Sequence, residues 1–309
     1  MTAGRRHSAA RPNHDATGCR RSRAGGVGPR SGQRQWIQAD IAVVAAAAAA
    51  APAQQGGGRL WSAVDAAIAG WRAESLVRTA FFVRKPPGIR LRLLPAGPDA
   101  SVALHDELTD WLDGLERAGV VRGWRFGRYD PEVDRFGGRV GMLLAHEHFD
   151  VSSRFALGFE QMPDAARRQA SLPLLSVATI NDLMARCVGD AVELGDTWVR
   201  VDDAVDTYVL DEPVTARLDP QQVFSALAME ASWLVALPEE AHDLLVQTRR
   251  DNELVAGRVR AATTAGRLDA GLCGWLADLC LFHWNRVGLP ADTARPLAST
   301  ITAVLRRPL

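Results

Sequence analysis

The tripeptide Pro86-Pro87-Gly88 is the feature that most constrains the fold, because it interrupts an apolar stretch and cannot lie inside a helix. The stretch Phe81–Val83 before it and the alternating stretch Ile89–Leu93 after it indicate two short strands joined by a turn. On the second strand, Arg90 and Arg92 are two residues apart and share the face opposite the apolar side chains. The chain therefore contains a sheet with one apolar and one charged face.

Two guanidinium groups on one face repel each other unless an anion, a carboxylate or solvent lies between them. The planar fork of arginine suits the recognition of a carboxylate, so Arg90 and Arg92 are candidate binding residues. The spacing fits equally the solvated outer face of an ordinary sheet, and this second interpretation stays open.

Helical and strand-like patterns alternate in the first half of the chain. Helices are expected over Leu60–Trp71 and Val102–Ala118, and further strands over Trp36–Val44, Val120–Tyr129 and Val140–Leu144. From Leu172 onward the pattern is mostly helical. Helices are expected over Leu174–Val192, from Asp219-Pro220 through Trp233, from Pro238 onward, and over Leu272–Val287, where Gly288 and Pro290 end the last one. The expected fold class is α+β, with a mixed sheet and flanking helices in the N-terminal half and a helical C-terminal half.

Charge is distributed unevenly along the chain. Residues 1–35 carry eight arginines and one acid, Asp15, and indicate a disordered tail or a start codon placed too far upstream. The rest has 28 basic and 35 acidic residues, a net charge of −7. Such a balance argues against a dedicated nucleic-acid binder. We expect residues 36–309 to form a single domain.

Cellular context follows from what the sequence lacks. The four cysteines form no CxxC pair, and Cys273 and Cys280 fit small core residues in a reducing cytosol. No apolar run of membrane-spanning length and no secretory signal is present. We therefore expect a cytoplasmic protein with no membrane contact.

Two further segments place charge where the pattern predicts a tight turn or burial. Before the Gly137-Gly138 pair, Glu132 and Arg135 are spaced i,i+3, which also suits an ordinary surface ion pair. Near the C-terminus, His283 shares a helical stripe with Leu272, Leu276 and Leu279 and should point inward, with Arg286 one turn later. A histidine on such a face is often a satisfied core residue, so a site and a structural role both remain open.

The motif His146-Glu147-His148 follows the strand expected over Val140–Leu144, so its two histidines would share one side. It lacks the HExxH spacing that puts two metal ligands on one helix face, and a metal is the less favoured interpretation. No phosphate-binding loop, nucleophile elbow or dinucleotide fingerprint is present. We expect no metal and no cofactor.

Taken together, these segments carry a family resemblance. Their order is WIQADI, FFVRKPPGIRLRL, YDPEVDRFGG followed by VSSRFAL, and FHWNR. The chain resembles the thiopeptide-type bacteriocin biosynthesis proteins, which are similar to the C-terminal elimination domain of class I lanthipeptide dehydratases. The likeness extends over about residues 36–290, and the order and spacing of the motifs carry it.

The resemblance implies a lyase of antibiotic peptide biosynthesis that acts without a cofactor. In such systems a separate protein uses glutamyl-tRNA to esterify Ser or Thr of a ribosomally made precursor, which has a leader and a core rich in Ser, Thr and Cys. The elimination protein then removes the α-proton and expels glutamate, leaving dehydroalanine or dehydrobutyrine. The implied partners are therefore the precursor peptide and the glutamylating protein, with no direct contact to nucleic acid.

Site residues are carried over by motif. The resemblance places the catalytic arginine pair at Arg90 and Arg92, its acidic partner at Glu132, a second arginine at Arg135 and the C-terminal histidine at His283. Arg92 and His283 are the expected acid/base pair. The expected substrate-binding residues are Arg84, Lys85, Asn285 and Arg286.

Two alternatives accompany this assignment. Many elimination domains have a histidine where this chain has Gly88. The related pyridine synthases share the fold but perform a formal [4+2] cycloaddition of two dehydroalanines and expel the leader. A non-catalytic subunit that binds the leader or scaffolds the partner enzymes is the other alternative. Elimination is favoured by the presence of Glu132, Arg135 and the His-x-Asn-Arg motif, because that reaction has a free carboxylate to hold.

Overall fold

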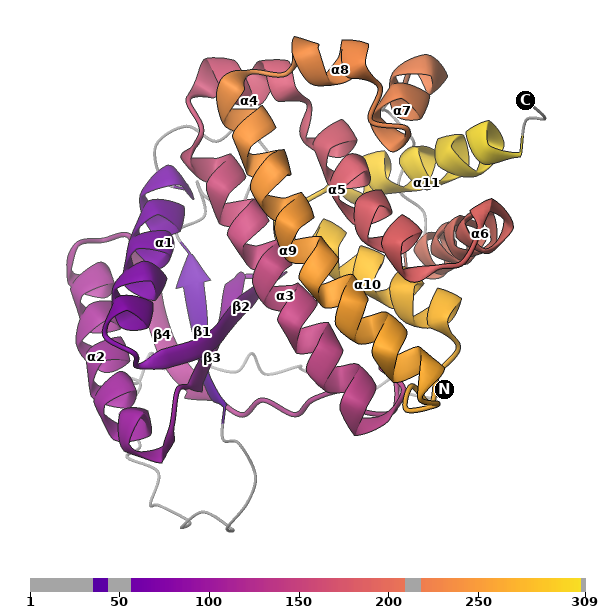
Figure 1. Ribbon diagram of the computed structural model, residues 1–309. Helices are drawn as coiled ribbons and strands as arrows, with labels where there is room; N and C mark the ends of the chain where they lie inside the picture. Colours follow the sequence, from indigo (N-terminus) through magenta and orange to yellow (C-terminus); the bar gives the residue numbers. More distant parts are fainter. Residues whose placement is uncertain (1–35, 44–56, 209–217, 307–309) are drawn as a thin grey trace, which may run out of the picture. The chain divides into compact units, whose positions relative to one another are not determined.

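The computed structural model describes residues 36–43, 57–208 and 218–306. The expected tail, residues 1–35, lies outside the described residues, and the domain extent of 36–309 stays a prediction. The first half folds as a sheet with two helices (Figure 1). Its elements are β1 (Ile37–Val43), α1 (Gly57–Ala73), β2 (Val77–Lys85), β3 (Gly88–Pro95), α2 (Pro98–Arg117) and β4 (Val121–Gly127).

The four strands pair in the order β2-β3-β1-β4. All three pairings are antiparallel, so the prediction of a mixed sheet is wrong in that detail. The Pro86-Pro87 turn joins β2 to β3 as an antiparallel hairpin, as the sequence predicted. β1 then enters between β3 and β4, and in this order no described strand has the same direction as its neighbour.

Side chains alternate between the two faces of this sheet. On one face, apolar residues such as Ala39, Ile41 and Leu91 are buried in a core that α1 and α2 complete. On the other face β3 carries Arg90 and Arg92. The alternation in Ile89–Leu93 therefore predicted the two faces correctly, and it leaves polar groups on the face that α1 and α2 do not cover.

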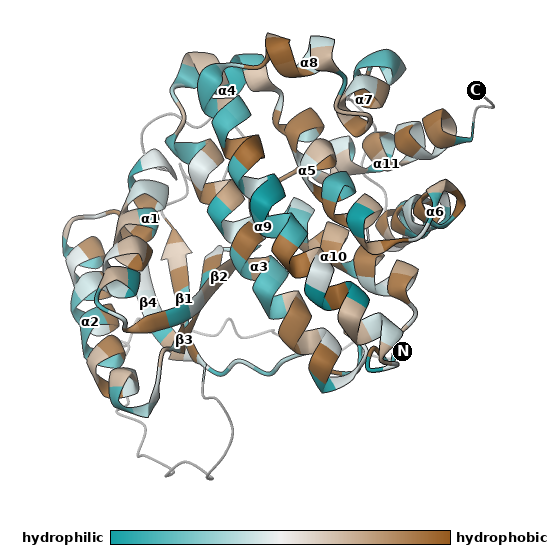
Figure 2. Cartoon of the chain, in the orientation of Figure 1, coloured by the Kyte–Doolittle hydropathy of each residue, from teal (hydrophilic) through white to brown (hydrophobic). Residues whose placement is uncertain are grey.

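The C-terminal half is helical, which confirms the α+β class. Its helices are α3 (Gly138–Gln161), α4 (Asp164–Ala170), α5 (Leu172–Cys187), α6 (Ala191–Tyr208), α7 (Pro220–Leu227), α8 (Ala231–Ala236), α9 (Glu239–Thr264), α10 (Leu272–Val287) and α11 (Ala291–Leu305). The long helix α3 packs against β2, α1, α9 and α10 and so joins the two halves. Figure 2 shows α10 largely apolar and α9 with many hydrophilic residues. Within the described residues, no helix combines the length and apolarity that crossing a bilayer requires.

One predicted strand is wrong. Val140–Leu144 lies inside α3, which begins at Gly138 after the N-cap Gly137, and both glycines have a positive φ. Because α3 is packed on several sides, its buried residues do not form one narrow stripe, and a short apolar run within it resembles a buried strand. His146 and His148 consequently lie on a helix and not after a strand.

Most helix ends in the C-terminal half agree with their sequence signals. The Asp219 carboxylate caps α7 by accepting from the backbone N–H of Gln221, and Gly288 ends α10 in the left-handed region. Two predicted helices are too long. The helix expected to reach Trp233 ends at Leu227, before Met229 with its positive φ of 47°, and α5 ends at Cys187.

Candidate active site

The open face of the sheet carries a row of charges that crosses three strands. Asp40 on β1 is paired in register with Arg90 on β3 and with Arg125 on β4. Its carboxylate oxygens lie 3.5 Å from Arg90 Nε and 3.4 Å from Arg125 Nε. In the next row, Arg92 Nε donates to Gln38 Oε1 at 2.8 Å, and Gln38 Nε2 donates to Asp40 at 2.8 Å. Arg90 therefore has a carboxylate partner, whereas Arg92 is held by an amide.

Arg92 faces a tyrosine and a histidine that are hydrogen-bonded to each other. Its guanidinium lies 4.2 Å from the centre of the Tyr129 ring, and the Tyr129 hydroxyl is 2.7 Å from Nε2 of His146. Burial raises the pKa of Tyr129 to about 12, against the opposing charge of Arg92. Burial, together with the charges of Arg92 and Arg286, lowers the pKa of His146 to about 3. At neutral pH the pair is an uncharged phenol and an uncharged imidazole.

Arg286 on α10 is a fully buried cation among aromatic rings. Its guanidinium lies 4.0 Å from the centre of the Phe149 ring, and 5.6 and 5.7 Å from those of Phe81 and Phe282. None of its three side-chain nitrogens has a hydrogen-bond partner among the described residues. Burial and the charge of Arg92 lower its pKa well below the usual value. A buried guanidinium without a carboxylate is costly to the fold and marks a site where an anion can bind.

His283 points inward, as its helical stripe predicted. Its side chain is fully buried, and Nδ1 lies 2.9 Å from the Ser152 hydroxyl. The rings of His148 and Phe155 lie 6.3 and 5.5 Å from it, centre to centre. Burial and the charge of Arg286 lower the pKa of His283 to about 3, so this imidazole is also neutral. His283 lies on the helical side of the cluster, next to α3, and not on the sheet face.

Glu132 and Arg135 form the ion pair that their spacing suggested, at 3.1 Å, with the Glu132 side chain 52% exposed. Arg135 also donates from Nε to Asp278 on α10 at 2.9 Å, so it ties the turn after β4 to that helix. At Gly137 an added Cβ would lie 2.6 Å from the backbone nitrogen of Ala270, which confirms the close backbone approach. The charge of Glu132 is among those that act on Arg92.

The expected substrate-binding residues divide into different environments. Arg84 lies 3.0 Å from Glu160, donates to the Arg286 carbonyl at 2.9 Å and stacks on Trp61 at 4.3 Å. Asn285 hydrogen-bonds the backbone of Arg84, and Lys85 is exposed beside the proline turn. The structure thus gathers Arg92 and Arg286 around one aromatic cluster and places the other three residues at its margin.

Two residues of the site, Tyr129 and His146, lie in the sequence motifs but were not predicted to belong to the site. Tyr129 opens the quoted motif YDPEVDRFGG, and its position before an acid and a proline gave no signal of a partner. His146 was weighed only as a metal ligand, with Glu147 and His148. In the structure Glu147 pairs with Arg258 at 2.8 Å, and the described residues contain no group of three or more His, Cys, Asp or Glu able to hold a metal.

Comparisons with known proteins identify the family and the fold. The family model described as "Lantibiotic biosynthesis dehydratase C-term" matches residues 49–303. The tRNA-dependent lantibiotic dehydratase MibB from Microbispora sp. 107891 superposes over 90% of this chain, with 17% identity and a TM-score of 0.60, and this chain spans 28% of the length of MibB. The protein TsrL superposes over 89% of this chain and 99% of its own, with 13% identity and a TM-score of 0.55. No curated protein sequence matches the chain.

Proposed function

The chain belongs to the family of lantibiotic dehydratase C-terminal domains, and from this premise we propose that it eliminates glutamate from glutamylated Ser or Thr of a ribosomally made precursor peptide. The product would carry dehydroalanine or dehydrobutyrine, as in thiopeptide and lanthipeptide biosynthesis. The proposed partners are the precursor peptide and a separate protein that attaches glutamate from glutamyl-tRNA. This dependence on glutamyl-tRNA supports a cytoplasmic location.

One observation carries the proposal: the guanidinium groups of Arg92 and Arg286 lie near the same ring, that of Phe81, and within the described part of the chain neither forms an ion pair with a carboxylate. Burial and the like charge of Arg92 lower the pKa of Arg286, while burial and the like charge of Arg90 lower the pKa of Arg92. Arg90, in contrast, already has Asp40 as a partner. A bound carboxylate would relieve the repulsion and give charge-assisted hydrogen bonds. Glutamate offers such a carboxylate both as the glutamyl side chain and as the leaving group.

The reaction itself needs a proton acceptor and positive charge. The Cα–H bond of the modified residue breaks, its electron pair forms the Cα=Cβ bond, and the Cβ–O bond breaks to release glutamate. Positive charge from Arg92 and Arg286 stabilises both the enolate-like transition state and the departing carboxylate.

Two neutral histidines can accept the α-proton. His283 is the family's C-terminal histidine and lies next to α3, behind the sheet face. His146 reaches the cluster through Tyr129 and is influenced directly by Arg92. Besides burial, the charge of Arg286 lowers the pKa of both histidines, and the charge of Arg92 also lowers that of His146. A bound anion would therefore raise the pKa of each imidazole and make it a better base. We propose that Arg92 and His283 remain the acid/base pair, with His146 the competing assignment.

The test supplies the purified protein with a synthetic peptide that carries an O-glutamyl serine. Elimination predicts free glutamate and a dehydroalanine peptide by mass spectrometry. Turnover only of a pre-dehydrated peptide, with release of a leader, would show a cycloaddition instead. Binding without turnover would indicate the scaffold role.

Variants assign the residues in the same assay. Arg92→Ala and His283→Ala should stop turnover, while Arg295→Ala should not, because Arg295 pairs with Asp206 on α6 and contacts no residue of the site. Loss of turnover in His146→Asn with retention in His283→Ala would move the base to His146. Full activity in both Arg92→Ala and His283→Ala would show that the site is elsewhere.

A further inference from the structure

Side chains, and no other strand of the described residues, bond the outer edge of β2. β2 is the last strand of the sheet, so every second backbone N–H points away from β3. The N–H of Ala80 donates to the Asp150 carboxylate at 2.8 Å. The N–H of Phe82 donates to the Ser153 hydroxyl at 3.3 Å. The N–H of Arg84 donates to the Asn285 side-chain carbonyl at 2.9 Å.

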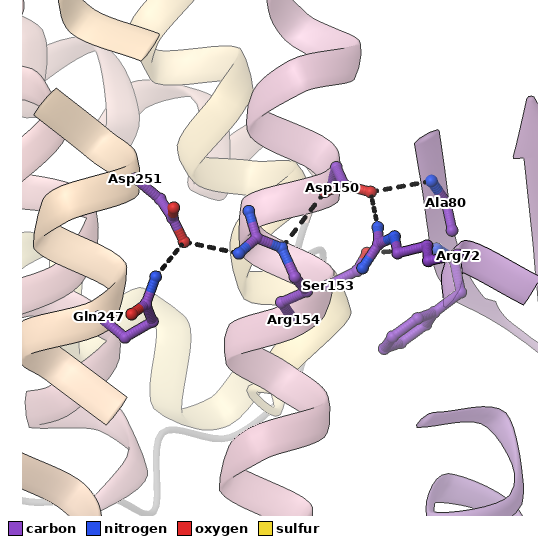
Figure 3. A network of polar contacts seen from close by, with 8 residues as sticks. Arg72, Ala80, Asp150, Ser153, Arg154, Gln247 and Asp251 are labelled. Carbon is purple, nitrogen blue, oxygen red and sulfur yellow. Dashed lines mark hydrogen bonds and ion pairs between the residues drawn. The ribbon is translucent and has the colours of Figure 1, made fainter. Parts of the chain in front are cut away.

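Two helices share this edge. Asp150 and Ser153 belong to α3, and Figure 3 shows both side chains turned toward the strand, with Arg72 of α1 on the same carboxylate. Asn285 belongs to α10 and forms two bonds, because its Nδ2 also donates to the Arg84 carbonyl at 3.0 Å. Its amide therefore takes the place of a neighbouring β-strand peptide.

Asn285 links α10, which carries His283 and Arg286, to the sheet, which carries Arg92. On α10 it lies directly before Arg286 and two residues after His283. On the sheet, β2 pairs with β3 so that Phe81 faces Arg92. A fixed register between Asn285 and Arg84 consequently sets where Arg286 and His283 lie relative to Arg92.

A second contact between β2 and the end of α10 also fixes these two elements relative to each other. Arg84 Nε donates to the carbonyl of Arg286 in the last turn of α10, where a backbone carbonyl lacks a helical partner. The guanidinium of Arg84 occupies the space above Gly288, where an added Cβ would lie 2.9 Å from Cζ of Arg84. The end of α10 is therefore fitted to β2 at one specific place.

We propose that Asn285 is a positioning residue, whose amide fixes α10 to the edge of β2 and thereby holds Arg286 and His283 at the correct distance from Arg92. Both polar atoms of its side chain bond the Arg84 backbone, so the proposal assigns Asn285 a positioning role in place of the substrate contact that the sequence suggested. This inference rests on the proposed function, because it concerns the geometry of the same site.

The test compares Asn285→Ala with Gln169→Ala, on the glutamylated serine peptide. Gln169 is a matched control, since it is another exposed amide that bonds a backbone carbonyl of a different helix, Ala236 at 3.2 Å, away from the site. A purely structural role predicts the same loss of melting temperature and the same kcat in both variants. Positioning predicts a kcat reduced by about 10-fold or more only in Asn285→Ala, with KM within about two-fold of the wild type.

The conservative variant Asn285→Asp keeps the acceptor for the Arg84 N–H and loses the donor, so its kcat should lie between those of the wild type and Asn285→Ala. A raised KM with unchanged kcat in Asn285→Ala would show contact with substrate and overturn the proposal, as would equal kcat values in the Ala variant and the control. If the wild type itself gives no turnover, the proposed function has failed. A crystal structure of Asn285→Ala then decides the positioning role, which requires α10 to be displaced relative to Arg92 and is overturned if the sites superpose.

Discussion

Replacement of Arg286 by methionine should make the protein more stable and abolish its activity. Arg286 is fully buried, and no described residue accepts a hydrogen bond from its side chain. Methionine is unbranched, has a similar length and can fill the space among Phe81, Phe149 and Phe282 without a charge. A residue that costs stability is explained by a role other than folding, and the role proposed for Arg286 is the binding of an anion.

The magnitude follows from two opposing effects. Burial of an ion costs several kcal/mol even after relaxation, and contact with aromatic rings returns about 2 kcal/mol. The nearest ring, that of Phe149, is 4.0 Å away, which makes this return effective. A net stabilisation of about 2 kcal/mol would raise the melting temperature by about 4–8 °C.

The assay is thermal and chemical unfolding of Arg286→Met beside Arg84→Met. Arg84 has an ion pair with Glu160 and a bond to the Arg286 carbonyl, so its replacement should lower stability by about 1–3 kcal/mol. The two arginine variants should therefore change stability in opposite directions. A loss of stability in Arg286→Met as large as that in Arg84→Met would refute the reasoning, because it would mean that the buried charge is already compensated in the folded protein.

Two further predictions concern pH and packing. Since the folded pKa of His283 is about 3, well below its value of 6.5 when unfolded, the unfolded chain binds the additional proton between these limits, and stability should fall as the pH is lowered from 6.5 toward 3. His283→Asn should reduce this dependence by up to about 1.4 kcal/mol per pH unit in denaturant titrations, and an unchanged slope would contradict the assignment. Gly127→Ala should reduce kcat, because the new Cβ would lie 2.5 Å from Gln38 Nε2 and would displace the amide that holds Arg92. Gly114→Ala is the control: its new Cβ would have no atom within 4 Å, so kcat should be unchanged. Equal kcat values for the two glycine variants would show that Gln38 does not hold Arg92 in place.

The sheet was predictable because its signals are local. The Pro86-Pro87-Gly88 turn and the alternation of Ile89–Leu93 depend on residues that are adjacent in sequence, and both were confirmed. Helix α10 was predicted with the bounds that the structure gives it for the same reason, since Gly288 in the left-handed region ends it, whereas the helix after it, α11, was not predicted. Local conformational preference sufficed for these elements.

Long-range packing explains what could not be predicted. Val140–Leu144 resembled a strand because α3 is buried against several neighbours, and this burial removes the helical periodicity from the sequence. The role of Asn285 depends on Arg84, which is 201 residues away, and no spacing rule connects them. Tyr129 and His146 likewise meet only because β4 and α3 converge beside Phe81. The motifs named most of the candidate residues, and the fold alone showed which of them lie together.

The central claim is that the chain removes an α-proton and expels glutamate. The most direct test is a single-turnover reaction on an O-glutamyl serine peptide that carries deuterium at Cα of the modified serine, followed by mass spectrometry of the peptide. Elimination breaks the Cα–D bond, so the account predicts a dehydroalanine peptide without deuterium and one equivalent of free glutamate. A serine peptide that releases glutamate and keeps its deuterium would show simple ester hydrolysis and would contradict the account.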